Sequence, residues 1–312
     1  MALSHDLIQA LDDLSGVHPG FRPAHAKGVL LEGVFAPSPG GASLTRAPHL
    51  HRESTPVTVR FSDSSGLPSV ADNDLQNASP RGFAVRFHLA EHVHTDIIGH
   101  SHNGFPVRTP EEFLEFLRAA KVSGPDAPKP SPIEQFLGTH PTALAFVLAP
   151  KPFPTSFAKE AFFTVNAFKF TNHEGDSQFG RFRIRPDGGG EYLDAVAAAA
   201  QTPNYLFEEL TERIAKGPIK LHVVVELAAT GDVVDDATIH WPEDRVQLEF
   251  GTITLTGLVA NGTTEERHII FDPIPRVEGI DPSADPLLEA RAAVYLESGR
   301  RRREAAQGTT AG

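Results

Sequence analysis

Hydrophobic and polar residues alternate, or apolar residues gather in short runs, through much of the chain between residues 28 and 100. The segments GVLLEGVF, PVTVRFS, GFAVRFHL and TDIIG are separated by Gly, Pro, Asp, Asn and Ser. Such alternation between such breaks is typical of β-strands. Further strands are predicted at 161–170, 178–185, 219–228 and 246–256. The pattern therefore predicts two groups of strands, one near each end of the chain.

Helical patterns stand before, between and after these strands. Residues 4–14 suit a short amphipathic helix capped by Ser4. The segment TPEE at 109–112 supplies a cap, a first-turn proline and early acids for a helix that runs to Ala120. A further short helix is predicted to begin at Ser131-Pro132, and a longer one covers 284–303. Two more are predicted within 190–216; the second of these is capped by Thr202-Pro203 and ends at Gly217.

The order of these elements predicts an α+β fold in a single domain. Strands, a helical insert, more strands and a final helix favour an antiparallel sheet or β-barrel with flanking helices. A βαβ arrangement is less favoured, because no Gly-rich phosphate loop follows any strand. The Pro-, Gly- and Ser-rich stretch 122–131 is interpreted as a loop rather than a linker, since strands resume on both sides of it.

Composition narrows the choice of partners. The 312 residues carry a formal net charge of -12, which argues against nucleic acid and anionic membranes and favours a small ligand. The chain has no cysteine, which excludes disulfides, thiolate catalysis and thiolate-bound metal or haem. The segment MALSHDLIQALDDLSG has neither a basic nor an apolar leader region, so a cytoplasmic location is expected.

The segment 284–303 contains a pair of residues with distinctive chemistry. Tyr295 follows Arg291 by four residues, so on a helix the guanidinium lies over the phenol and can hold it as phenolate. One use for a tyrosinate is as the iron ligand of a ferric haem. Arg302 returns to the same face, where it can bind a carboxylate of such a cofactor. A surface helix with a buried Tyr and solvated arginines is the alternative.

Two earlier segments carry further candidates. His25 lies among small residues, with Arg22 and Lys27 close by, so a flat acidic ligand could lie against it. On the strand at 59–62, Arg60 and Ser62 share one face, where they can bind a carboxylate and orient an imidazole. Each segment taken alone is also compatible with a purely structural histidine and an ordinary half-buried strand.

The histidines between residues 88 and 102 invite an alternative interpretation. His92 and His94, and likewise His100 and His102, are spaced to point the same way on strands and could form a zinc site. Neither pair has an obvious carboxylate in its own repeat, and no helical His-x-x-x-His motif is present. A hydrolase triad is less favoured still, because the Gly-x-Ser-x-Gly elbow is missing.

Taken together and in order, these segments resemble the haem catalase superfamily, particularly its short catalase-related peroxidase (mini-catalase) branch. The resemblance spans roughly residues 20 to 303. Any one motif is weak, but seven in register are specific. They are Arg22-x-x-His25-Ala26-Lys27-Gly28, Val59-Arg60-Phe61-Ser62, the stretch 79–87 (SPRGFAVRF), Phe168-Lys169-Phe170-x-Asn172, Thr238-x-x-Trp241-Pro242, the run from Phe271 to Asp285, and Arg291-x-x-x-Tyr295.

The resemblance implies a catalase-like antiparallel β-barrel that holds haem b. Tyr295 would be the proximal ligand of the haem iron, tuned by Arg291. His25 would be the distal acid–base group, oriented by Ser62. Three arginines would pair the haem propionates and an aromatic residue would lie beside the ring, namely Arg22, Arg60, Arg302 and Phe113. The domains implied are an N-terminal helical arm (1–19), the haem-binding domain (20–303) and a flexible tail (304–312).

Three departures from the family pattern bear on activity. Where the family has a distal asparagine after Asp-Leu-Val-Gly, this chain has His100, with Asn103 three residues further on. Either residue could take over the positioning of peroxide. Ser79 replaces an acid associated with the main channel, which favours larger or less polar peroxides. The chain also lacks the long arm and extensions of full catalases, so a more open haem is expected.

The expected activity is haem-dependent peroxidase turnover of hydrogen peroxide or organic hydroperoxides via a ferryl intermediate, with weak catalase activity. The expected partners are peroxide and a small organic electron donor, without nucleic acid or membrane, and a homo-oligomer is compatible with the resemblance. A haem isomerase or dehydratase of fatty-acid hydroperoxides, or a haem-binding sensor without turnover, remains as an alternative. The sequence leaves the donor open.

Overall fold

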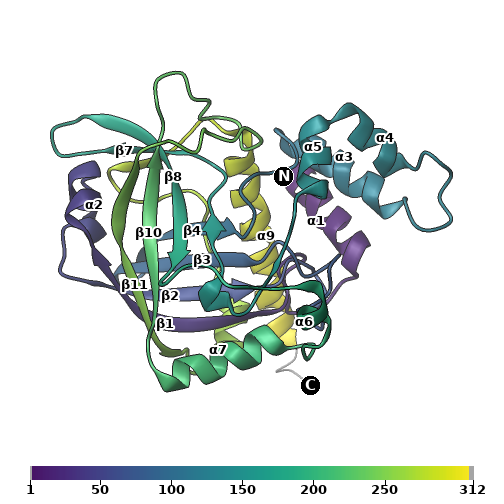
Figure 1. Cartoon of the computed structure of the whole chain (residues 1–312), viewed down its shortest axis with the longest axis horizontal. Coiled ribbons are helices and arrows are strands. Elements are labelled where there is room, and N and C mark those ends of the chain that lie inside the picture. Colours follow the sequence, from purple (N-terminus) through teal and green to yellow (C-terminus); the bar gives the residue numbers. More distant parts are fainter. Residues whose placement is uncertain (1, 309–312) are drawn as a thin grey trace.

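A β-barrel and a set of helices along one side of it make up the protein (Figure 1). The computed structural model describes residues 2–308. The eight barrel strands are β1 (Gly28–Pro37), β2 (Thr55–Ser62), β3 (Gly82–Ala90), β4 (Val93–His100), β6 (Phe162–Phe163), β8 (Ser177–Pro186), β10 (Ile219–Leu227) and β11 (Gln247–Leu258).

The barrel closes through antiparallel pairing in the order β10-β11-β1-β2-β3-β4-β6-β8, with β8 returning to β10. Closure leaves no free edge among these strands. The pairing is long everywhere except at β6, where His100 of β4 pairs with Phe163 and two β6 residues pair with β8. The expected antiparallel barrel with flanking helices is confirmed, and its shortest seam lies beside His100.

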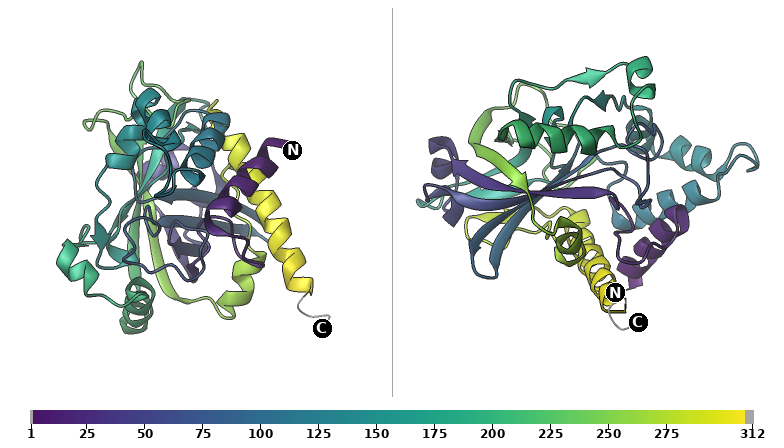
Figure 2. Two further views of the ribbon diagram at one scale, coloured as in Figure 1. Left: turned by 90° about the vertical axis from the view of Figure 1, so that its right-hand side faces the viewer. Right: turned by 90° about the horizontal axis from the view of Figure 1, so that it is seen from below.

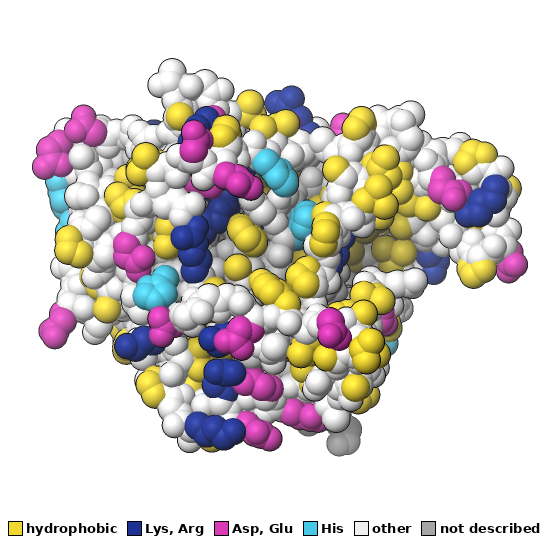
Figure 3. Space-filling model, viewed as in Figure 1, with side chains coloured by type: hydrophobic (Ala, Val, Ile, Leu, Met, Phe, Trp, Pro, Cys, Tyr) yellow, Lys and Arg dark blue, Asp and Glu magenta, His cyan; other side chains and the backbone are white. Residues whose placement is uncertain are grey.

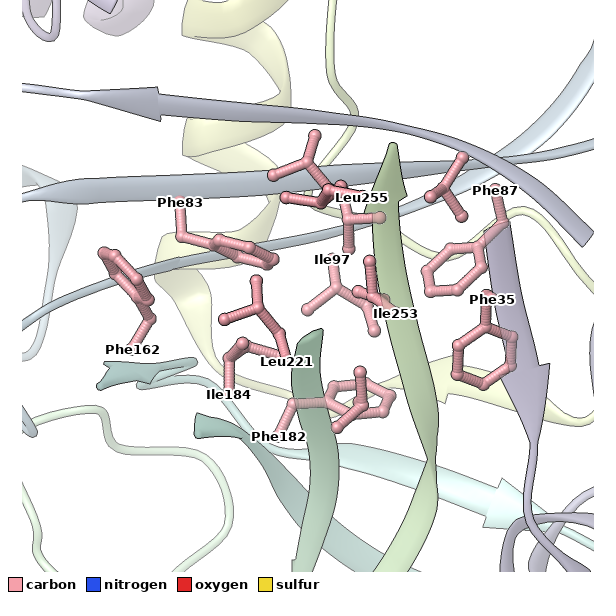
Figure 4. Close-up of a cluster of buried hydrophobic side chains, with 14 of the residues drawn as sticks. Phe35, Phe83, Phe87, Ile97, Phe162, Phe182, Ile184, Leu221, Ile253 and Leu255 are labelled. Carbon is pink, nitrogen blue, oxygen red and sulfur yellow. The ribbon is translucent and has the colours of Figure 1, made fainter. Parts of the chain in front are cut away.

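The barrel interior is filled by aromatic and branched aliphatic side chains (Figure 4). On β2, the buried Val57, Val59 and Phe61 point inward by the period of two. Rings meet edge-on, as Phe35 and Phe87 do at 5.1 Å between centroids. Each buried aromatic side chain contributes roughly 1.5–3 kcal/mol, so the core holds the barrel rigid and leaves its outer face available for a site.

The longest helix, α9 (Pro286–Gly308), and the helices of one lobe lie along one side of the barrel, while α2 (Pro39–Leu44) and α7 (Tyr205–Lys216) pack on β11. Helix α9 runs between the barrel and a helical lobe, as two views show (Figures 1 and 2). Helix α1 (Ala2–Ser15) packs against both α3 (Pro110–Lys121) and α9, and α8 (Gly262–His268) packs against α9 and β1. The lobe is completed by α4 (Pro132–Thr139) and α5 (Pro141–Leu148).

The remaining elements lie around the barrel ends. Strand β7 (Phe168–Thr171) pairs with β8 and β12 (Ile280–Pro282), and β5 (Phe153–Pro154) pairs with β9 (Tyr192–Leu193). The other helices are α2 (Pro39–Leu44), α6 (Ala195–Ala199), α7 (Tyr205–Lys216) and the 3-10 turns η1 (Pro48–Leu50) and η2 (Phe157–Lys159). On the face in Figure 3, acidic and basic side chains intermingle over the barrel, while hydrophobic ones gather over the lobe.

Most predicted elements are confirmed, and the exceptions have local causes. The expected strand 161–170 is interrupted, because the chain leaves the barrel after β6 and rejoins the sheet as β7. Ser4 and Thr202 are not caps: α1 begins at Ala2, and the N-cap of α7 is Asn204. Thr109 does form the expected capping box.

The end of the chain differs from the expected tail. Residues 304–308 continue α9, and 309–312 lie outside the described residues. No helix in the described part of the chain is long and apolar enough to cross a membrane.

Candidate active site

A cavity of about 270 Å³ lies between α9, the loop at 22–25 and the outer face of β2–β4. Strand periodicity turns even-numbered residues toward it, opposite the barrel core. Nine of the ten predicted site residues line this cavity: Arg22, His25, Arg60, Ser62, His100, Phe113, Arg291, Tyr295 and Arg302. The tenth, Asn103, is not among its lining residues in the described part of the chain.

His25 is held in a defined orientation by its backbone and by β2. Its φ of 56° lies in the left-handed region, which a non-glycine residue seldom adopts and which often marks functional sites. The His25 N–H donates to the carbonyl of Ser64 at 2.8 Å, and its Nδ1 lies 3.2 Å from Ser62 Oγ. Burial and the Arg60 charge lower the pKa of His25 to about 4. The imidazole is therefore neutral at pH 7.

Two glycines make room for this arrangement. A β-carbon at Gly82 would lie 2.7 Å from His25 Nδ1 and would also clash with Ser62 Oγ. A β-carbon at Gly28 would lie 2.9 Å from Arg60 Nε. Contacts this close require neighbouring groups to move. The glycines of the two motifs are therefore explained by the close approach of the backbone to the site.

Three arginines meet at one edge of the cavity. Arg60 Nε lies 2.8 Å from both carboxylate oxygens of Glu266, and Arg22 Nη1 donates to the same carboxylate. Arg302 donates to Ser298 Oγ at 2.9 Å and to the carbonyl of Ile269 at 2.8 Å. Among the described residues, its buried Nε has no hydrogen-bond partner. This edge therefore carries three guanidinium groups, of which Arg302 has no carboxylate partner among the described residues.

Tyr295 lies on the α9 face that borders the cavity, under Arg291. Arg291 Nη2 donates to the Tyr295 oxygen at 3.3 Å, as the four-residue spacing predicts. Arg291 Nη1 donates to Asn166 Oδ1, and Asn166 Nδ2 donates to Asp285 Oδ2 at 2.8 Å. Asn166 and Asp285 are both almost fully buried. This chain of hydrogen bonds fixes the guanidinium that holds the phenol.

Asn166, Asp285 and Glu266 were missed from the predicted site. Asn166 lies in the interruption between β6 and β7, where the apolar pattern predicts one continuous strand. A lone Asn in an apolar run was the available signal, since a buried amide needs partners. Asp285 lies within the motif that runs from Phe271 to Asp285. Glu266 lies five residues before that motif, and no feature of the surrounding sequence marks it as a site residue.

His100 lies on β4, beside the cavity and opposite Phe163. Its Nδ1 accepts a hydrogen bond from the His102 N–H at 3.3 Å. Burial, followed by the nearby His25, lowers the pKa of His100 to about 3. When Nδ1 of a neutral imidazole accepts a hydrogen bond, the ring proton is on Nε2. His100 can therefore donate one hydrogen bond through Nε2, as the nitrogen of an amide can.

Apolar groups from two helices border the cavity on the lobe side. Phe113 of α3 packs on Phe105 at 5.0 Å between ring centroids, and Leu7 and Leu11 of α1 complete this wall. Ser79 is not among the lining residues in the described part of the chain, so its expected influence on a channel stays a prediction. The cavity thus has apolar walls and one cationic edge.

These residues fit a flat, mostly apolar ring with acidic substituents at one edge. A phenol and an imidazole border the same cavity, apolar side chains surround it, and three arginines stand at its cationic edge. The zinc alternative is wrong for the described residues, where no group of three or more His, Cys, Asp or Glu could hold a metal ion.

Comparisons with known proteins agree with this geometry. The catalase family model matches residues 17–308. A catalase-related peroxidase of Mycolicibacterium paratuberculosis is 32% identical over 298 residues, which cover 93% of this chain and 92% of that protein. Another, from Synechococcus elongatus, is 32% identical over 296 residues, covering 94% and 86%.

Solved structures show the same fold. Catalase A from Saccharomyces cerevisiae matches with a TM-score of 0.80 at 24% identity, covering 95% of this chain and 64% of that chain. A fungal catalase matches with a TM-score of 0.79 at 24% identity, covering 90% and 59%.

Proposed function

Because the chain belongs to the catalase family and is an oxidoreductase that acts on peroxide, we propose that it is a haem b-dependent peroxidase. It would reduce hydrogen peroxide or organic hydroperoxides via a ferryl intermediate, use a small organic donor, and have weak catalase activity. The relatives named catalase-related peroxidase favour this function over a hydroperoxide isomerase or a sensor. A cytoplasmic location and a homo-oligomeric state belong to the same proposal.

The observation that carries the proposal is that His25 and Tyr295 border one cavity, each held by a partner. Ser62 lies within hydrogen-bond distance of the imidazole, and Arg291 donates to the phenol oxygen. Haem bound there through Tyr295 would supply the redox chemistry, with the tyrosinate favouring the ferric iron. Arg22, Arg60 and Arg302 would bind its propionates by charge-assisted hydrogen bonds.

His25 is suited to move a proton between the two peroxide oxygens. At pH 7 it is neutral, and in the tautomer whose Nδ1–H donates to Ser62 Oγ, Nε2 is free to accept a proton. His25 would take the proton of one peroxide oxygen and return it to the other, which departs as water or alcohol. The Ser62 hydroxyl, 3.2 Å from Nδ1, orients the ring, and Gly82 leaves the space that this orientation needs.

His100 is suited to position the peroxide. Because Nδ1 accepts from His102, its Nε2–H is available to donate one hydrogen bond from a neutral ring that borders the same cavity. An imidazole is larger than an amide and donates through a single proton, so it orders a second hydrogen peroxide less well. Ordered reactants can contribute several kcal/mol, so we expect donor oxidation to exceed oxygen release.

The absorption spectrum of the purified chain, recorded with and without peroxide, tests this function. A Soret band of ferric tyrosinate haem that changes on mixing with peroxide and returns on adding a phenolic donor supports the proposal. A colourless chain that does not bind added haemin contradicts it. Oxygen release and donor oxidation, measured on the same preparation, then establish whether peroxidase turnover dominates.

A further inference from the structure

Within residues 2–308, Glu266 is the one acidic side chain that forms ion pairs with the arginine cluster, defined as Arg22, Arg60 and Arg302. It comes from α8, and its side chain is 17% exposed. Both of its oxygens lie 2.8 Å from Arg60 Nε, and Arg22 donates to Oε2. No step proposed above uses this carboxylate, although it lies where ligand carboxylates are expected.

Glu266 is charged in this setting. Burial alone would raise the pKa of Glu266, but Arg60 and Arg22, by charge and by hydrogen bonds, lower it below its usual range. The arginines in turn repel one another: burial and the Arg60 charge lower the pKa of Arg22 well below its usual value, and Glu266 opposes this shift. The carboxylate and the guanidiniums therefore stabilise each other's ionised forms.

Each arginine of the cluster also donates to a backbone carbonyl. Arg22 Nη2 and Arg302 Nη2 donate to the carbonyl of Ile269 at 3.3 and 2.8 Å, and Arg60 Nη2 donates to the carbonyl of His25 at 2.9 Å. Each guanidinium keeps a backbone anchor without the carboxylate. The contribution of Glu266 is therefore its charge rather than the geometry it imposes.

Three guanidiniums less one carboxylate leave the cluster with two positive charges. A net charge of two balances a ligand with two carboxylates. Without Glu266 the net charge would be three, and one positive charge would stay unbalanced in a site shielded from water. We propose that Glu266 is an internal counter-ion of the arginine cluster, which stabilises the cofactor-free chain and matches the site to a dicarboxylate ligand. The inference rests on the proposed haem binding.

An internal counter-ion must also compete with the ligand. Glu266 repels carboxylates that approach Arg22 and Arg60, so ligand affinity is lower than three unopposed arginines would give. The same charge lowers the cost of three buried cations before a ligand binds. Removing it should therefore destabilise the cofactor-free chain and strengthen the preference for acidic over neutral porphyrins.

The preference is measured as a ratio within one variant. Cofactor-free full-length chain is titrated with protoporphyrin IX and with its dimethyl ester, followed by porphyrin fluorescence. For Glu266→Gln, the ratio of diacid to diester affinity should rise about tenfold or more, because one repelling charge is removed. Glu265→Gln removes an exposed charge from the same helix and should leave the ratio unchanged. An unchanged or lower ratio in Glu266→Gln contradicts the proposal.

Stability of the cofactor-free chain gives a second measurement. Arg22→Gln should lower the unfolding midpoint in the wild-type background, where it breaks an ion pair. In the Glu266→Gln background, Arg22→Gln should raise the unfolding midpoint, because it removes one of three arginine charges that no carboxylate balances. A decrease of equal size in both backgrounds contradicts the proposal. If Glu266→Gln alone does not fold, a folded double variant supports the charge balance and an unfolded one overturns it.

These outcomes separate the inference from the function on which it rests. A wild-type chain that binds neither porphyrin contradicts haem binding itself. A wild-type chain that binds protoporphyrin IX, with a Glu266→Gln variant that has the same ratio and the same cofactor-free stability, contradicts only the role of Glu266.

Discussion

Gly82 lies directly against His25, so that a β-carbon at residue 82 would come within 2.7 Å of the imidazole Nδ1. The same β-carbon would clash with Ser62 Oγ, which faces that nitrogen. The orientation of His25, the proposed acid–base group, therefore depends on residue 82 being a glycine. This relationship connects the RGF motif of β3 to the chemistry of a loop more than fifty residues earlier.

Gly82→Ala should displace His25 and Ser62 while leaving the Tyr295 side intact. We expect haem content to be retained and the reaction with peroxide to slow by about tenfold to a hundredfold, a part of what loss of the base itself costs. Gly257→Ala is the control, because its β-carbon would meet only Glu32 Oε1, at 3.8 Å. Stopped-flow absorption measures the rate, and an unimpaired Gly82→Ala would show that the site accommodates the methyl group.

Tyr295→Phe should remove the proposed iron ligand but preserve the packing of the ring. The variant should either lose haem or shift the Soret band, because a phenyl group cannot bind iron. Tyr192→Phe is a suitable control, since Tyr192 is partly exposed and bonds to Glu160 outside the cavity. Identical spectra for Tyr295→Phe and wild type would exclude tyrosinate ligation.

His25→Ala should bind haem and react very slowly with peroxide. Removing a general acid–base group typically costs about a hundred- to ten-thousand-fold in rate. His173→Ala, an exposed histidine between β7 and β8, provides the comparison and should react at the wild-type rate. If His25→Ala also keeps the wild-type rate, the acid–base role passes to His100.

The two positions considered for the missing family amide should behave differently. His100→Ala should slow the reaction with peroxide, and His100→Asn should raise the ratio of oxygen release to donor oxidation by restoring an amide. Asn103→Ala should change neither quantity by more than about twofold, since Asn103 does not border the cavity in the described structure. Oxygen-electrode and donor assays on matched preparations decide this, and the opposite ranking would return the role to Asn103.

The pH profile should be flat over the neutral range and fall in acid. The pKa of His25 is lowered from 6.5 to about 4, so the rate of reaction with peroxide should hold to about pH 5 and halve near pH 4. The free energy of unfolding changes over a wider pH range than the rate does. Between pH 6.5 and 4, His25 binds a proton in the unfolded chain but not in the folded chain. Folding therefore loses free energy as pH falls, by about 3 kcal/mol below pH 4 through His25 alone, and His49 and His100, whose pKa values are lowered to about 3, add to this loss.

Circular dichroism recorded across the same range separates the two effects. His25→Ala should show a smaller loss of stability between pH 6.5 and 4 than the wild type. An acid limb of the rate that begins near pH 6.5, in chain that is still folded, would contradict a depressed pKa for His25.

The sequence by itself determined the strands, most helices and nine residues that the structure brings to one cavity. These features follow from local spacing: alternation along β2 sets Arg60 and Ser62 on one face, and a four-residue step on α9 sets Arg291 over Tyr295. The order of the motifs supplied the resemblance to a family. Local rules do not specify how a segment turns when it leaves a sheet.

The tertiary structure alone decided the groups that meet from distant segments. The interruption after β6 carries Asn166 to Arg291, 125 residues away in sequence, and α8 carries Glu266 to Arg60, 206 residues away. It also distinguished His100, which borders the cavity, from Asn103, which does not. The physical reason is that a buried charge or amide pairs with a polar group that tertiary packing places next to it. The spacing of residues along the sequence does not specify which group that is.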